Sequence, residues 1–315
     1  MKLHEDRAAF AAILEEISEE FGLRRDVLEK DYYVTLLLKE LSKKQDEVRA
    51  YFKGGTALYK ALRSIRRFSE DIDLSVYADD LPTESQKQKR LKNAALKFAC
   101  LAKGRTLENK RGSITCEYNY DPLYAVDGSD ALQRFGNVRV EATSFTVSRP
   151  VENVTVSPYL YELCGEEKRR ILEREYGVRE FFVKTIGIER IFIDKIFASE
   201  FYYIRRALAD ASKHIYDIAV LMQNERIKEF LSDEKKVVEM VGLKRTEERA
   251  RIGGIPETLD IKDFSYFDSI KTDAELKRSF QAMQRIYVFS AKDMIAYESL
   301  PDIFERLRQI FACLK

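Results

Sequence analysis

The sequence predicts an α+β fold in which a small β-sheet core flanked by helices is followed by a mainly helical lobe. Two observations support this prediction. Short segments that alternate polar and apolar residues, typical of half-buried strands, are interspersed with helical patterns in the first part of the chain. After Phe181-Phe182-Val183 almost every pattern is helical. We therefore place a boundary near residue 180 and expect lobes at 1–180 and 181–315.

Length and composition indicate a globular protein. The 315 residues, 45% of them hydrophobic, are enough to bury a sizeable core in two lobes. Lys and Arg total 54 against 53 Asp and Glu, so a nucleic-acid site would have to be a local patch. The four cysteines are scattered and histidines number two, which disfavours a disulfide framework or a zinc site. A charged start and the lack of a long apolar run predict a cytoplasmic protein without membrane contact.

The first elements follow from local periodicity. Apolar residues at three- and four-residue steps predict helices over 5–21, ending at Gly22, and over 26–44. Tyr51-Phe52 is expected to form a short strand that enters a turn at Gly54-Gly55. Because strong helix formers without a breaker follow, a helix should start directly after the glycines.

The remaining elements alternate before the helical lobe begins. Polar–apolar alternation predicts three strands, and helical spacing predicts a Lys-rich helix and a series of later helices. The expected strands are Asp71–Tyr77, Ser113–Tyr120 and Gly136–Phe145; the expected helices are 84–103, 189–206, 212–223, 225–240, 273–290 and 302–314. The Gly253–Pro256 stretch should be a loop.

The Gly-Gly turn and the strand after it suggest phosphate and metal chemistry. Gly54 and Gly55 let the backbone approach a phosphate closely, and Thr56 adds a hydroxyl at the start of a helix. Asp71 and Asp73 are two residues apart, so a strand presents both carboxylates on one face, as a Mg²⁺ or Mn²⁺ site for a nucleoside triphosphate requires. Alone, either motif is usually a turn or a solvated strand edge; their combination favours a metal–triphosphate site.

Three further residues are candidates for the site, and each could instead have an ordinary structural role. Glu141, flanked by Val140 and Ala142, could supply a third metal-binding carboxylate, or it could be a surface residue paired with Arg139. On expected helices, Lys195 could contact a phosphate or be an ordinary exposed lysine, and Asp217 could simply form a local ion pair. The basic clusters that could contact RNA are Arg63, Arg66 and Arg67, then Lys168–Arg170, Arg205-Arg206 and Lys244–Arg251.

The sequence motifs of this chain resemble those of the AbiEii/AbiGii-type, MenT-like toxin family, which belongs to the polymerase-beta-type nucleotidyltransferase superfamily. The blocks that carry the resemblance are Phe52-Lys-Gly-Gly-Thr-Ala-Leu-Tyr-Lys, Arg67-Phe-Ser-Glu-Asp-Ile-Asp-Leu, Leu28-Glu-Lys-Asp-Tyr-Tyr, Ile193-Asp-Lys-Ile-Phe-Ala and Tyr216-Asp-Ile. They span about residues 28–220. Two features depart from the family pattern: fourteen residues separate Thr56 from Asp71, and the last block has Lys213 and His214 before its Asp.

The resemblance implies a mixed-sheet nucleotidyltransferase core and a helical lobe. It implies that Lys195 and Asp217 contribute to activity, and that Lys53 and Ser69 bind the nucleotide together with Gly54, Gly55 and Thr56. The implied reaction is Mg²⁺-dependent transfer of a nucleoside monophosphate from NTP to RNA, with tRNA as the implied acceptor, by the toxin of a toxin–antitoxin or abortive-infection system. A winged-helix antitoxin is the implied partner. The alternatives are a non-catalytic nucleotide-binding module that holds GTP, for example, and an enzyme that nucleotidylates proteins.

Overall fold

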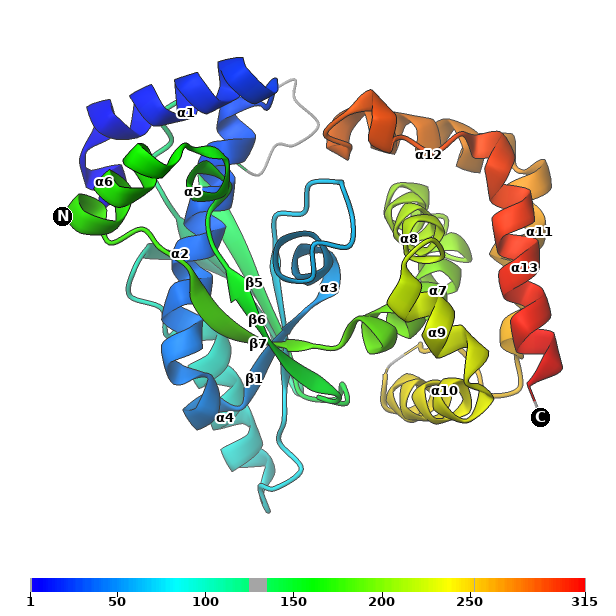
Figure 1. Ribbon diagram of the computed structural model, residues 1–315. Helices are drawn as coiled ribbons and strands as arrows, with labels where there is room; N and C mark the ends of the chain where they lie inside the picture. The colour runs from blue at the N-terminus through cyan, green and yellow to red at the C-terminus, as the bar shows by residue number, and fades with distance from the viewer. Residues whose placement is uncertain (1, 125–134, 252, 315) are drawn as a thin grey trace. The chain divides into compact units, whose positions relative to one another are not determined.

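The computed structural model describes residues 2–124, 135–251 and 253–314. They divide into two compact units. Unit 1 comprises Met1–Ala61, Phe68–Ser144 and Val151–Thr185, and unit 2 comprises Leu62–Arg67, Phe145–Pro150 and Ile186–Lys315. The predicted α+β class is confirmed, because a mixed sheet with helices is followed by a mainly helical region (Figure 1).

Unit 1 is built on a seven-stranded sheet with the strand order β3-β4-β5-β2-β1-β7-β6. The pairs β1–β2, β3–β4 and β4–β5 are antiparallel, whereas β1–β7 and β2–β5 are parallel. The strands are β1 (Ala50–Lys53), β2 (Ile72–Val76), β3 (Ala102–Lys110), β4 (Ser113–Asn119), β5 (Asn137–Thr143), β6 (Val151–Val156) and β7 (Phe181–Ile186).

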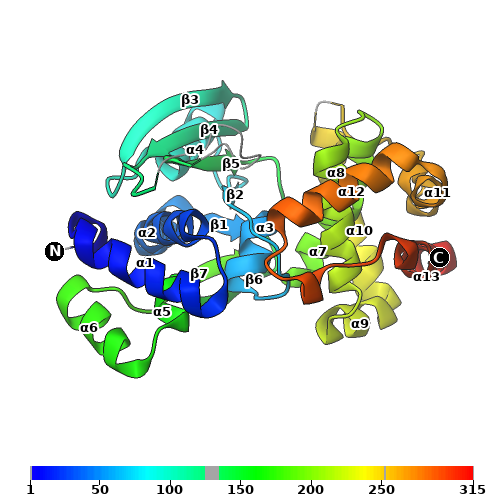
Figure 2. The same cartoon turned by 90° about the horizontal axis from the view of Figure 1, so that it is seen from above.

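The helices of unit 1 bury one face of this sheet. Both α2 (Arg25–Val48) and α4 (Glu84–Leu96) pack on the central strands, whose inward-facing residues Phe52, Leu74 and Val140 are fully buried (Figure 2). The helix α1 (Arg7–Phe21) ends at Gly22 as predicted, where φ is 67°. The other elements are η1 (Leu3–Glu5), α3 (Gly54–Thr56), a π-helical turn η2 (Ala57–Ala61), α5 (Tyr159–Leu163) and α6 (Glu166–Tyr176).

Unit 2 is helical. Its centre is α8 (Leu208–Leu221), which packs against both α7 (Ile188–Tyr203) and α12 (Ala274–Tyr287). Around these helices lie α9 (Glu225–Ser232), α10 (Glu234–Ala250), α11 (Ser265–Thr272), α13 (Leu300–Cys313) and the short turns η3 (Ile261–Asp263), η4 (Ala291–Asp293) and η5 (Tyr297–Ser299). None of the helices described here has the length and apolarity needed to cross a membrane.

Two predicted elements were wrong in their bounds. The Lys-rich helix expected over 84–103 ends at Leu96, and β3 begins at Ala102. The helix expected over 225–240 is two helices, because the Asp233 side chain accepts a hydrogen bond from the Lys236 amide and starts α10 anew. The elements that the sequence pattern did not predict include β3, β6, β7, α5, α6 and α11.

Candidate active site

The turn after β1 is shaped by the contact between Gly54 and Asp73. Gly54 has a φ of 80°, which disfavours any residue with a side chain. A Cβ atom at this position would also lie 2.0 Å from Oδ2 of Asp73, so a side chain fits only if that carboxylate moves. Gly54 is therefore required both by its backbone conformation and by the close approach of Asp73.

Asp73 lies in a row of polar residues that crosses three neighbouring strands. In the sheet register, Lys53 of β1 is opposite Asp73 of β2, and Asp73 is opposite Glu141 of β5. Residues in register on neighbouring strands share a face of the sheet. Asp71 directly precedes β2 and, like Asp73, is half-buried, whereas Glu141 is exposed. The structure thus brings the predicted carboxylates to one part of the sheet.

These carboxylates fit a hard divalent cation. Mg²⁺ prefers oxygen ligands and is often held by only one or two protein carboxylates, with water and substrate phosphates completing its shell. Asp71 and Asp73 supply two such groups. Among the residues that the structure describes, no three Asp, Glu, His or Cys side chains come close enough to hold a metal ion. Glu141 is therefore near in register without forming a closed cluster with the two aspartates.

Thr56 and Ser69 connect the glycine turn to the start of β2. The Thr56 hydroxyl donates to the Asp71 carbonyl oxygen at 2.5 Å and lies 3.0 Å from the Ser69 hydroxyl. Thr56 is almost fully buried, and Ser69 is half-buried. The Thr56 side chain therefore holds the backbone of Asp71 against the helix that follows the glycines.

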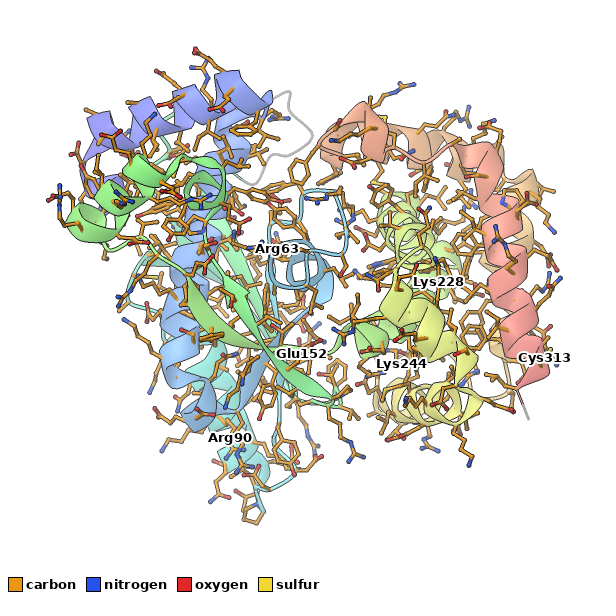
Figure 3. The ribbon with its side chains drawn as sticks, in the orientation of Figure 1. Arg63, Arg90, Glu152, Lys228, Lys244 and Cys313 are labelled. Carbon is orange, nitrogen blue, oxygen red and sulfur yellow. The ribbon has the colours of Figure 1, made fainter. Side chains whose placement is uncertain are left out.

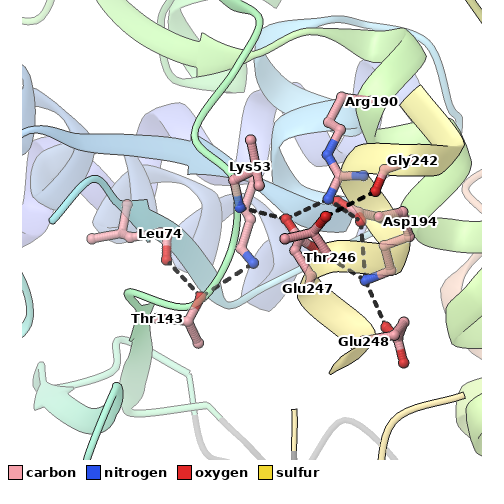
Figure 4. A network of polar contacts seen from close by, with 11 residues as sticks. Lys53, Leu74, Thr143, Arg190, Asp194, Gly242, Thr246, Glu247 and Glu248 are labelled. Atoms are coloured by element: carbon pink, nitrogen blue, oxygen red, sulfur yellow. Dashed lines mark hydrogen bonds and ion pairs between the residues drawn. The ribbon is translucent and has the colours of Figure 1, made fainter. Parts of the chain in front are cut away.

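Lys53, at the end of β1, contacts the neighbouring strand β5. Its Nζ lies 3.3 Å from the Thr143 hydroxyl, which also approaches the Leu74 carbonyl oxygen (Figure 4). A half-buried ammonium group on the same sheet face as Asp73 adds positive charge where a phosphate would meet the carboxylates.

Two buried charges on α2 support the site from the covered side of the sheet. Asp31 accepts hydrogen bonds from Lys60 Nζ at 2.6 Å, from the Tyr59 hydroxyl at 3.1 Å and from the Tyr159 amide at 2.7 Å. Burial, reinforced by Asp31, raises the pKa of Tyr59 well above its usual value, so its hydroxyl stays a donor. Asp31 thereby fixes the turn η2 that follows the glycines.

The neighbouring Lys30 holds the other segment of the site. Its ammonium is fully buried and lies 3.4 Å from the Glu70 carboxylate, directly before Asp71. The Glu29–Tyr33 block was noted in the sequence only as part of a helix and of the family resemblance. The signal that could have revealed this role is a run of charged residues in a helix that is otherwise rich in Tyr and Leu.

A second charged cluster lies within unit 2. Arg67 binds both carboxylate oxygens of Asp217, with Nε at 2.6 Å and Nη2 at 2.7 Å. Lys195 Nζ lies 3.0 Å from Asp217 Oδ2 and 3.3 Å from Nδ1 of His214. The structure therefore brings Lys195 of α7 and Asp217 of α8 into direct contact.

The protonation states in this cluster follow from its surroundings. Burial alone would raise the pKa of Asp217, but the positive charges of Arg67 and Lys195 outweigh it and hold the pKa below its usual value. Burial and the nearby Lys195 lower the pKa of His214 well below 6.5. Asp217 is thus ionised and His214 neutral, so His214 Nδ1 accepts from the Lys195 ammonium.

Arg67 is the partner of Asp217 that the sequence did not indicate. Lys213, one helical turn before Asp217 on α8, pairs with Asp210 at 3.4 Å rather than with Asp217. Arg67 belongs to a segment distant in sequence and was assigned to a possible RNA-binding cluster. Since its guanidinium is buried on Asp217, it is not an accessible RNA contact.

Lys244 of α10, labelled in Figure 3, also forms its ion pairs within the protein. It is buried in a network with Asp194, Glu247 and Glu248, and Glu247 also pairs with buried Arg190 (Figure 4). The acidic members of this network take up the charge of both basic residues. The Lys244–Arg251 segment is therefore, at its start, part of the packing of unit 2 rather than a basic surface.

Comparison with known proteins gives matches to a family model and to solved structures. The family model described as nucleotidyl transferase AbiEii toxin, type IV toxin–antitoxin system, matches residues 36–311. No protein with a curated description matches the chain. Among solved structures, MenT4, nucleotidyltransferase toxin Rv2826c from Mycobacterium tuberculosis H37Rv, is similar over 94% of this chain and 99% of that chain, with 14% sequence identity and a TM-score of 0.40.

Proposed function

This chain belongs to the AbiEii family of nucleotidyltransferase toxins of type IV toxin–antitoxin systems, and we propose that it transfers a nucleoside monophosphate from Mg²⁺–NTP to RNA. We propose tRNA as the acceptor, Mn²⁺ as an alternative metal, the cytoplasm as the place of the reaction and a winged-helix protein as the cognate antitoxin. The observation that carries the proposal is the packing of the Asp73 carboxylate on Gly54, in register with Lys53 and Glu141.

In the proposed reaction, a hydroxyl oxygen of the RNA attacks the α-phosphorus of the NTP. A new phosphodiester bond forms, the bond to the β-phosphate bridging oxygen breaks, pyrophosphate leaves, and the hydroxyl proton passes to solvent. When bound, the divalent metal neutralises charge on the phosphates and lowers the barrier to attack. Asp71 and Asp73 would hold it. Glu141, opposite Asp73 in the sheet register, is the proposed third ligand, although the structure does not gather the three carboxylates into one cluster.

The other residues of unit 1 would bind the triphosphate. The backbone amides of Gly54 and Gly55 lie at the first turn of a helix, where N–H groups lack intrahelical partners and attract anions. Lys53 supplies a positive charge on the same sheet face. Thr56 and Ser69 keep this turn and Asp71 in a fixed relation through their hydroxyl contacts.

We assign Lys195 the role of neutralising phosphate charge and Asp217 the role of positioning Lys195. Both carboxylate oxygens of Asp217 are already engaged by Arg67, and Oδ2 also lies 3.0 Å from Lys195 Nζ. A carboxylate bound in this way is poorly suited to take a metal or a proton. It is well suited to hold the Lys195 ammonium group in one place.

The test is to incubate the purified protein with each α-³²P-labelled NTP, Mg²⁺ and total tRNA, and to follow the label on denaturing gels. We expect one or more NTPs to label RNA, and we expect EDTA and the Asp71→Ala/Asp73→Ala variant to abolish labelling. Undiminished labelling by that variant would overturn the mechanism. Label that appears only on protein would support the protein-nucleotidylating alternative, and metal-independent NTP binding without any transfer would support the non-catalytic one.

A further inference from the structure

We infer that an exposed basic surface formed by α4, β3 and the turn that follows β3, residues 84–111, binds the phosphate backbone of the acceptor RNA. We call this surface the basic edge. The inference rests on the proposed function for the identity of its ligand, and it places part of the RNA on a surface distinct from the metal and nucleotide residues.

The charge of the basic edge is far out of balance with the rest of the protein. Residues 84–111 contain nine Lys and Arg but only two acidic residues, Glu84 and Glu108, a net charge of +7. The whole chain has a net charge of +1, so the remainder carries −6. Such a concentration of one sign creates a local attractive potential for a polyanion that the overall charge does not reveal.

Part of this positive charge has no acidic counterpart. Arg90, labelled in Figure 3, pairs with Asp80, and Arg105, Lys110 and Arg111 pair with Glu117, Glu108 and Glu84. Four exposed lysines form no ion pair with the described residues; they are Lys89, Lys92, Lys97 and Lys103. Flexible, unpaired lysines are suited to phosphates, whose binding releases counterions without needing one fixed geometry.

The fold brings the end strand of the basic edge near the candidate site. Because α4 packs on the face of the sheet opposite Asp73, RNA bound by the α4 lysines would pass around β3 to reach the site. β3 is the end strand of the sheet. The register runs from Asp73 through Glu141 and Thr115 to Glu108 of β3, across three strand spacings. At about 4.8 Å per spacing, β3 lies roughly 14 Å from β2. A few nucleotides of RNA can bridge that distance.

One side chain of β3 points toward the site face of the sheet. Arg105 pairs with Glu117, which lies two residues from Thr115 on β4 and so shares its face. Thr115 is opposite Glu141, the proposed third metal ligand. Positive charge therefore continues from the basic edge onto the face that carries the carboxylates.

Polyanionic RNA fits the basic edge better than an acidic protein does. A protein interface usually has buried apolar or aromatic anchors at its centre. In residues 84–111 the large hydrophobic side chain that is strongly exposed is Leu107, at 44%. Charge without apolar anchors is typical of salt-dependent phosphate binding.

The test compares two double charge reversals with the same change in net charge. Lys92→Glu/Lys103→Glu alters the basic edge, and Lys235→Glu/Lys292→Glu alters two other exposed lysines that form no ion pair with described residues. Binding of fluorescein-labelled tRNA is measured by anisotropy between 50 and 200 mM salt, without NTP. Thermal melts check that both variants are folded, and NTP binding checks the nucleotide site.

We expect the basic-edge variant to bind tRNA at least about tenfold more weakly, with a salt slope smaller by about 1.5. The control should stay within about twofold of the wild type, and NTP affinity should be unchanged in both variants. Equal tRNA affinity of the two variants, or no tRNA binding by the wild type, would overturn the inference. If the wild type binds tRNA through this surface but transfers no label, the proposed function fails while the surface assignment stands.

Discussion

Asp73 of unit 1 and Asp217 of unit 2 are both aspartates in charged surroundings, yet they are built for different tasks. Asp73 packs against the backbone of a glycine and stays half-buried in a row with Lys53 and Glu141. Asp217 is fully buried, and Arg67 binds both of its carboxylate oxygens. An accessible carboxylate can take a metal, whereas a buried and paired one stabilises and positions its neighbours.

Asp73 and Asp217 should therefore respond to substitution in opposite ways. Loss of a metal-binding carboxylate removes activity and leaves the fold intact. Loss of Asp217 leaves two positive charges without their counter-charge in the interior of unit 2, so the fold itself should weaken.

The largest effect is expected from Asp71→Asn/Asp73→Asn. The variant should lose at least about 10³-fold in nucleotide transfer, because the amides cannot hold the charge of a divalent cation. Its free energy of unfolding should change by less than about 1 kcal/mol, since the two side chains are half-buried on the sheet face. Single-turnover kinetics and urea unfolding measure the two quantities. A strong loss of stability would show that these aspartates are structural.

Asp217→Asn should give the largest loss of stability. Removal of the counter-charge of Arg67 and Lys195 should cost about 3–5 kcal/mol in the free energy of unfolding. Asp210→Asn on the same helix is the matched control, because Asp210 is half-exposed and, among the described residues, forms an ion pair with Lys213 alone; it should cost no more than about 1 kcal/mol. Equal costs in urea unfolding would contradict the assigned role of the buried cluster.

Gly54→Ala should combine a modest loss of stability with a clear loss of activity. The left-handed backbone should cost about 1–2 kcal/mol, and displacement of Asp73 should lower transfer on the order of 10²-fold. Gly22→Ala is a close control, because φ there is 67° and nothing lies within 4 Å of an added Cβ. It should show a similar loss of stability with normal activity. If the Gly54→Ala variant keeps normal transfer activity, the close packing of Asp73 on Gly54 is not required for activity.

The smallest effect concerns His214 and pH. Because its pKa in the folded protein is held well below 6.5, the unfolded chain gains a proton between pH 6.5 and 5 that the folded protein does not. His214 therefore lowers stability as the pH falls through this window, and His214→Gln should reduce the loss by about 1 kcal/mol. Buried Glu29, whose pKa is raised to about 7, acts in the opposite direction in both proteins. The difference between the two urea-unfolding profiles isolates His214, and parallel profiles would contradict the prediction.

Local sequence patterns predicted those parts of the fold whose side chains alternate between core and solvent. The strands β2, β4 and β5 and most helices have one buried face, so their periodicity is visible. β3 was missed because its residues are exposed or half-buried along its whole length and therefore show no alternation. The basic edge was missed because the sequence pattern assigned its first lysines to one predicted helix and did not reveal β3 beside it.

In the candidate site too, local sequence patterns did not reveal the contacts between segments that are distant in the chain. Gly54 and Asp73 could be paired from a short motif, but Arg67 and Asp217 are 150 residues apart and no local spacing connects them. The resemblance to the family singled out Lys195 and Asp217, while their direct contact needed the structure. Asp31 and Lys30 likewise support the site through contacts that only the packing of α2 creates.

The most direct test of the account is a Mn²⁺-binding measurement by electron paramagnetic resonance, with a non-hydrolysable NTP analogue and without RNA. We expect the wild type to bind Mn²⁺–NTP, Asp71→Asn/Asp73→Asn to reduce this binding at least about tenfold, and Asp217→Asn to retain it under conditions where it is folded. Unchanged binding by the first variant, or loss of binding only in the second, would contradict the claim that unit 1 holds the metal–nucleotide complex.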